Sequence, residues 1–168
     1  MAITITRNGY GQVEPNHLSA PRDGRVYGQL PAKSTITELE QGMFVKYDYA
    51  AGEVNFTGAG PWMLVYNEEK LYDERHQMHK DYVMKASDFY DGKMYPRVFG
   101  IVEGDIYTTN MIKAGVSVKV GDTLAPGSDG ILAKTTGESL PAGVVFKIVK
   151  ETTMPDLQPA VKLQCIQA

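Results

Sequence analysis

The stretch GVSVKVGDTLAPGSDGILAK, from Gly115 to Lys134, decides the class of fold, because short apolar runs and turn formers alternate along it. Val116, Val118 and Val120 occupy every second position, which places their side chains on one face of an extended strand. The run PGSDG at residues 126–130 then supplies turn formers before the next short apolar run. The stretch therefore predicts short strands joined by tight turns.

A similar spacing occurs nearer the N-terminus, in STITELEQGMFVKYDYAAGEVNF at residues 34–56. Gly42 and Gly52 enclose an apolar run there, as Gly121 and Gly130 do in the later stretch, and the two spacings differ by one residue. This predicts two similar β-hairpins that face each other in a barrel. Because turn-rich β sequences also produce such spacings by chance, a coincidence is the alternative.

The composition favours a single, mainly β domain. The chain has 168 residues with 17 glycines and 10 tyrosines, and it lacks the long runs of alanine, leucine, glutamate and lysine that are typical of helices. A chain of this length buries roughly 68–70% of its unfolded surface, so we expect a substantial core.

The charge of the chain excludes several kinds of partner, and its cysteine content excludes stabilisation by an internal disulfide. Seventeen basic and twenty acidic residues give a net charge of −3 and are mixed along the chain, so the basic stripe that binds nucleic acid or an anionic membrane is missing. No stretch approaches the roughly 18 apolar residues of a membrane span. We therefore expect a soluble protein with no nucleic-acid and no membrane partner. Cys165 is the only cysteine, which excludes an internal disulfide.

Further strands are predicted outside these two stretches. WMLVY at residues 62–66 is a continuous apolar run typical of a strand buried on both faces, and residues 142–151 and 159–167 alternate as two closing strands. Residues 62–112 contain an elaboration of the predicted barrel, and this region includes the most highly charged segment of the chain. A short helix near residues 67–80 fits its apolar spacing, although strands fit part of it as well.

The N-terminal residues 1–33 are rich in glycine, proline and arginine, and their apolar residues are scattered. We expect a flexible arm here, attached to a domain at residues 34–168. It is either an ordinary loose terminus or a segment that becomes ordered on a partner surface.

Few residues point to chemistry. His76 and His79 lie three apart and could bind a metal from one helical face, with Glu69, Asp73 or Asp81 as oxygen ligands. A solvated, charged face explains them better, because metal-binding helices usually place two histidines four apart. The motifs of nucleophilic serine, phosphate-binding and dinucleotide-binding sites are missing, so we expect no enzyme activity, no metal and no cofactor.

The strand pattern carries a resemblance to a known family. The closing meander AGVSVKVGDTLAPGSDGILAKTTGESLPAGVVFKIVKE (114–151), followed by AVKLQCIQ (160–167), and the related LEQGMFVKYDYAAGEVNF (39–56) give it. In this order of apolar strand, Gly-Asp, turn and final strand, the chain resembles the lambda-type head-decoration, or capsid cement, proteins of tailed bacteriophages. The resemblance covers residues 35–168.

The resemblance implies a small β-barrel or β-tulip, commonly a homotrimer, that docks on the outside of the expanded capsid and stabilises the head. Its partners would be the major capsid protein and other copies of itself. It would reside on the capsid exterior of the virion, and in the host cytoplasm during assembly. The alternative is another virion component, such as a tail or head-fibre attachment module, and an enzyme or a metal-dependent binding module comes third.

The N-terminal arm supplies the capsid-binding residues that we expect. Ile3, Ile5, Tyr10, Val13 and Leu18 are the arm residues whose apolar side chains have no obvious core to join. They would pair with a capsid-protein sheet edge or lie in a groove between capsomers. Alternatively, some of them form the first strand of the barrel.

Overall fold

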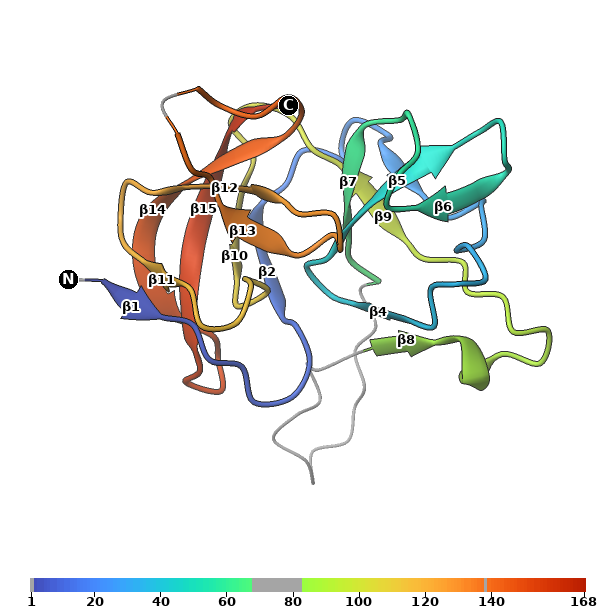
Figure 1. Cartoon of the computed structure of the whole chain (residues 1–168), viewed down its shortest axis with the longest axis horizontal. Coiled ribbons are helices and arrows are strands. Elements are labelled where there is room, and N and C mark those ends of the chain that lie inside the picture. Colours follow the sequence, from blue (N-terminus) through green and yellow to red (C-terminus); the bar gives the residue numbers. More distant parts are fainter. Residues whose placement is uncertain (1, 68–82, 138) are drawn as a thin grey trace.

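The computed structural model describes residues 2–67, 83–137 and 139–168. The chain is mainly β, as predicted, and the described helix content is one short 3-10 turn, η1, at Ala86–Asp88. Figure 1 shows two sheets side by side, with the six-stranded sheet on the left and the five-stranded sheet on the right. The predicted helix near residues 67–80 lies outside the described residues.

The six-stranded sheet has the order β13-β12-β14-β15-β10-β2 and is antiparallel throughout. It contains most of the C-terminal half of the chain, joined by one N-terminal strand. Its strands are β2 (Val13–His17), β10 (Ile106–Thr109), β12 (Thr123–Pro126), β13 (Leu132–Lys134), β14 (Val145–Thr153) and β15 (Pro159–Gln167).

The five-stranded sheet has the order β3-β9-β7-β5-β6 and is also antiparallel. Its strands are β3 (Val26–Tyr27), β5 (Phe44–Asp48), β6 (Glu53–Asn55), β7 (Trp62–Val65) and β9 (Val98–Gly100). Two strand pairs complete the fold: β1 (Ile3–Thr4) with β11 (Ser117–Val118), and β4 (Glu38–Glu40) with β8 (Val83–Lys85).

The five-stranded sheet is buried on both faces because its strands alternate between two cores. Phe44 and its register partner Leu64 belong to the core shared with the six-stranded sheet, where the ring of Phe44 lies 5.5 Å from that of Phe146. Val45 and its partner Met63 belong to a second core on the opposite face, which the β4–β8 pair helps to cover. Burial on both faces explains why residues 62–66 form a continuous apolar run.

The same arrangement of strands occurs twice along the chain. Neighbours run β6-β5-β7-β9-β3 in one sheet and β13-β12-β14-β15-β10 in the other, and both series follow the same chain order. A parallel bridge joins Ala32 to Val54 in the first half, and another joins Ile112 to Leu132 at the equivalent place in the second. The similar hairpins predicted from the glycine spacing are therefore present.

The backbone hydrogen bonds of the two halves also correspond. Gly42 N donates to Val65 O at 3.0 Å, and Gly121 N donates to Ile148 O at 2.9 Å. Both glycines have positive φ, 87° and 94°, a conformation that a side chain disfavours. The two glycines are thus equivalent turn positions, and the repeat extends from about residue 24 to 100 and from about residue 104 to 167.

The prediction of a closed barrel is wrong, since neither sheet closes on itself. After β3 and β10 the chain turns towards the far edge of its own sheet but makes only the single bridge at Ala32 or Ile112 there. The two halves bury their apolar faces against each other instead, so closure is not needed to form a core.

The N-terminal residues do not form a loose arm. β1 pairs with β11, β2 pairs with β10 and β3 pairs with β9, so all three strands of this region are part of the body. The composition of residues 1–33 predicted a flexible arm because these strands are short and are separated by turns. The sequence therefore shows no continuous apolar face.

Candidate interaction site along the N-terminal segment

The five predicted binding residues do not share one free surface. Ile5 and Val13 are 1% and 9% exposed and lie in the core between the sheets, and Ile3 and Leu18 are half-buried against the same core. Tyr10 is half-buried and lies apart from the others, with Lys85 Nζ 5.4 Å from the centre of its ring. The premise that these side chains lack a core is therefore wrong for Ile5 and Val13. The structure agrees better with the alternative that some of these residues form the first strand, because Ile3 lies on β1 and Val13 on β2, although the sheets do not form a barrel.

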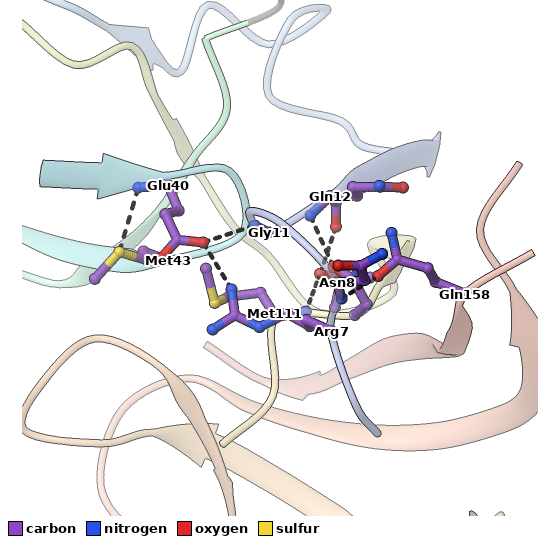
Figure 2. A network of polar contacts seen from close by, with 10 residues as sticks. Arg7, Asn8, Gly11, Gln12, Glu40, Met43, Met111 and Gln158 are labelled. Carbon is purple, nitrogen blue, oxygen red and sulfur yellow. Dashed lines mark hydrogen bonds and ion pairs between the residues drawn. The ribbon is translucent and has the colours of Figure 1, made fainter. Parts of the chain in front are cut away.

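The segment from Arg7 to Gln12 links β1 to β2 and is fixed on one side by hydrogen bonds to Glu40, the last residue of β4. The carboxylate of Glu40 accepts bonds from Arg7 Nη1 at 2.6 Å and from the backbone N–H of Gly11 at 2.7 Å (Figure 2). A Cβ at Gly11 would overlap the carbonyl oxygen of Gln41. Close backbone approach therefore requires glycine at this position.

The other side of the segment is fixed to the turn between β14 and β15. Asn8 N donates to Gln158 Oε1 at 2.7 Å, and Gln12 Nε2 donates to Asp156 Oδ2 at 2.7 Å. Gln158 Nε2 donates to the same carboxylate at 2.6 Å. Burial disfavours the charge on Asp156, but these donated bonds outweigh it, so that its pKa lies below the usual 3.8.

Buried polar groups continue the network behind the segment. Gln12 N donates to Asn110 Oδ1 at 2.8 Å, and the hydroxyl of Thr109 donates to Gln12 O at 2.7 Å. The same hydroxyl accepts the N–H of Met111 at 2.9 Å. Thr109 and Asn110 are fully buried. The N-terminal segment is thus fixed through specific polar contacts, not only through apolar packing.

The turn that this network fixes forms one wall of a shallow hollow of about 410 Å³ on the outer face of the six-stranded sheet. Thr108 and Lys162, which are register partners on β10 and β15, contribute to the hollow, and Thr108 donates to Asn16 at 2.6 Å. Leu157 lines it from the turn. The hollow is open, and its lining mixes polar and apolar side chains.

Leu157 is unusual in two respects. Its φ is +70°, and it is the only non-glycine residue with positive φ in the described part of the chain. Its side chain is 79% exposed. Left-handed backbone costs an ordinary residue about 1–2 kcal/mol, and an exposed leucine gains nothing from burial, so neither feature stabilises the free protein.

The predicted closing strands, residues 142–151 and 159–167, leave Leu157 in the connection between them, but the sequence analysis did not identify it as a candidate binding residue. The signal that could have identified Leu157 is its apolar side chain within the turn-forming sequence MPDLQP. Glycine or asparagine usually occupies left-handed backbone in such turns.

Two buried groups that can ionise, Cys165 and Tyr107, are held in their neutral forms. Burial raises the pKa of the Cys165 thiol to about 11, so it stays protonated near neutral pH, and it donates to Gln167 O at 3.1 Å. Burial also raises the pKa of Tyr107 well above its usual value. Residues 2–67, 83–137 and 139–168 contain no group of three side chains that could hold a metal. His76 and His79 lie outside these ranges.

Within the described part of the chain, no helix is long and apolar enough to cross a membrane. Comparison of the sequence and the structure with protein-family models, curated proteins and solved structures gives no match. The two halves of the chain can, however, be compared with each other, position by position.

Proposed function

We propose that the protein is a structural component of a tailed-phage virion that binds the outer surface of the expanded capsid and stabilises it. The resemblance of residues 35–168 to head-decoration proteins motivates the proposal. The mainly β body supports it, because two sheets that pack on a shared core and are linked by the bond from Phe44 N to Gly130 O give a rigid block that can brace neighbouring subunits. As in that family, the assembled form would be a homotrimer, located on the capsid exterior.

The observation that carries the proposal is Leu157. An exposed apolar side chain on left-handed backbone is unfavourable in the free protein, and such outliers concentrate at functional sites. On a capsid surface the side chain would enter an apolar depression and its burial would contribute about 1.5–3 kcal/mol. The bonds from Asn8 and Gln12 to the turn hold it in position beforehand, which lowers the entropic cost of binding.

This assignment moves the expected contact away from the N-terminal arm. Ile5 and Val13 are core residues, so deletion of residues 1–20 would unfold the body and could not isolate a binding function. Ile3, Tyr10 and Leu18 stay candidates for capsid contact only through their exposed atoms. Point substitutions at the surface are therefore the appropriate test.

Co-sedimentation with undecorated capsids of the source phage tests the proposal, with unexpanded procapsids as the comparison. We expect saturable binding to expanded shells alone. Leu157→Asn should weaken this binding at least about tenfold, because asparagine tolerates left-handed backbone but loses the apolar contact. Leu140→Asn is the matched control, since Leu140 is also an exposed leucine, 45% exposed, on a different loop.

The outcomes separate the alternatives. Binding to neither kind of shell would refute the capsid function, and binding to purified tails in the same assay would assign the protein to the tail or to a fibre attachment. Equal binding by wild type and Leu157→Asn would keep the capsid function but refute the role of Leu157.

A further inference from the structure

The internal repeat makes β3 and β10 equivalent strands. Val26 pairs with Phe99 and Tyr27 with Val98, just as Ile106 pairs with Gln164 and Tyr107 with Leu163. The strands also begin in the same way, since Gly100 N donates to Arg25 O and Cys165 N donates to Asp105 O, both at 2.8 Å. What covers one strand therefore indicates what can cover the other.

The outer edge of β10 is covered by a strand, and that of β3 is not. β2 pairs with β10 in antiparallel register, with His17 opposite Ile106 and Glu14 opposite Thr108. In the five-stranded sheet β3 is the last strand, with no further described strand beside it. Among the described residues, the first half of the chain thus has no counterpart of β2.

The exposed backbone of this edge is arranged to pair. The bond from Gly100 places the carbonyl of Arg25 towards β9, so the alternation of an antiparallel ladder directs the N–H and C=O groups of Val26 and Gly28 outwards. Gly28 N donates at 3.1 Å to Oε1 of Gln29, an exposed side chain that a partner's carbonyl can replace. Gly28 and Gln29 are exposed, and no atom lies within 4 Å of a Cβ placed on Gly28. The backbone at this position is therefore accessible from solvent.

Three arginines lie next to this edge in the sequences of β3 and β9. Arg22 and Arg25 precede β3, and Arg97 precedes the neighbouring strand β9, with its guanidinium 5.6 Å from the ring of Phe99. Asp23 partly offsets them, through ion pairs with Arg22 at 2.9 Å and Arg25 at 3.0 Å. Arg22 and Arg25 together carry more charge than Asp23, and the other carboxylate that acts on Arg22, Asp105, is buried, so the exposed charge beside β3 favours a ligand that carries negative charge.

We infer that the open edge of β3, from Val26 to Gln29, binds an extended, acidic segment of a partner protein, which adds to the five-stranded sheet as an antiparallel strand. Backbone hydrogen bonds supply the attraction, as they do between β2 and β10, and the arginines select acidic side chains. The inference is independent of the capsid function, because it rests on the repeat and on the charges around β3.

NMR titration of the full chain with a blocked peptide of alternating glutamate and valine tests the inference, with the peptide at millimolar concentration. The expected result is a saturable shift, with slower hydrogen exchange, of the amides of Val26 and Gly28. The amides of Tyr27 and Gln29, which face inwards, should move much less. A lysine–valine peptide of the same length should bind at least about tenfold more weakly.

Two variants of Gly28 provide the matched pair. Gly28→Pro removes the outward N–H and should abolish the shifts, whereas Gly28→Ala keeps this N–H in open space and should leave them unchanged. Arg22→Glu, at a side chain that is 75% exposed, should weaken binding of the acidic peptide without affecting the fold. The Arg22→Glu variant still tests the inference if Gly28→Pro fails to fold.

Three results would overturn the inference. The first is the absence of saturable shifts at Val26 and Gly28, and the second is equal binding of the acidic and basic peptides. The third is a shift of the same amides with protein concentration alone, which would identify a second copy of the chain as the occupant.

Discussion

Gly52 and Gly130 occupy equivalent turns in the two halves of the chain, yet only Gly130 lies against the other half. Both have positive φ, 67° and 74°. A Cβ on Gly52 would meet nothing within 4 Å, whereas one on Gly130 would overlap the carbonyl oxygen of Phe44, the residue whose N–H donates to Gly130 O at 2.7 Å. The turn at Gly130 is therefore part of the contact between the two sheets.

This difference predicts unequal costs for the same substitution. Gly52→Ala should lower the free energy of unfolding by about 1 kcal/mol, the cost of left-handed backbone alone. Gly130→Ala should lower it by more than about 3 kcal/mol, because the methyl group overlaps backbone and the two sheets must separate slightly. Urea denaturation of both variants measures the difference, and equal losses would contradict the close approach at Phe44.

The protein should be more stable when Tyr107 lacks its hydroxyl group. The side chain is fully buried, and its hydroxyl has no hydrogen-bond partner in the described part of the chain. Since an unpartnered buried polar group costs about 1–3 kcal/mol, we expect Tyr107→Phe to raise the free energy of unfolding by roughly 1 kcal/mol. Tyr27→Phe, at the equivalent half-buried position, should change it by less than about 0.5 kcal/mol. A loss of stability in the first variant would indicate a partner for this hydroxyl.

Leu157→Asn should stabilise the isolated protein while it weakens binding. Asparagine accepts a φ of +70° at lower cost than leucine, so the free energy of unfolding should rise by about 1 kcal/mol. The same variant should lose affinity for capsids, as described above. Opposite signs in thermal denaturation and co-sedimentation would distinguish a binding residue from a purely structural one.

Asp156 should make the protein less stable in acid. Burial disfavours its charge, but bonds from Gln12 and Gln158 lower its folded pKa below the usual 3.8. Because the folded pKa is the lower one, the stabilisation is fully present above the unfolded pKa and is lost as the pH falls through the folded pKa. Between about pH 5 and about pH 3, wild type should therefore lose more stability than Asp156→Asn. Parallel pH profiles of denaturation would contradict this.

Much of the local structure was predictable from residue periodicity. The apolar run at residues 62–66, the alternation at residues 159–167 and the glycine spacings correspond to β7, β15 and the repeated turns. The three valines of the opening stretch were less informative. Val118 is buried and Val116 is half-buried, but Val120 is 53% exposed, because β11 ends at Val118.

The candidate site was less predictable than the fold. The N-terminal segment could be identified as special from its composition, but not the fact that Ile5 and Val13 complete the main core. Glu40 and Asp156 are ordinary acidic residues in the sequence. They become the fixed points of the segment only through bonds to Arg7 and Gln12, which are 33 and 144 positions away.

By itself, the amino-acid sequence determined that this chain is made of short strands and tight turns, since alternation and turn chemistry act between residues a few positions apart. It also determined that the turn pattern occurs twice. Tertiary structure alone decided that β1 and β2 join strands about a hundred residues further on, that β10 is covered while β3 is open, and that Leu157 projects into solvent. These depend on pairings between distant segments, and strand periodicity carries no information about which partner a strand will meet.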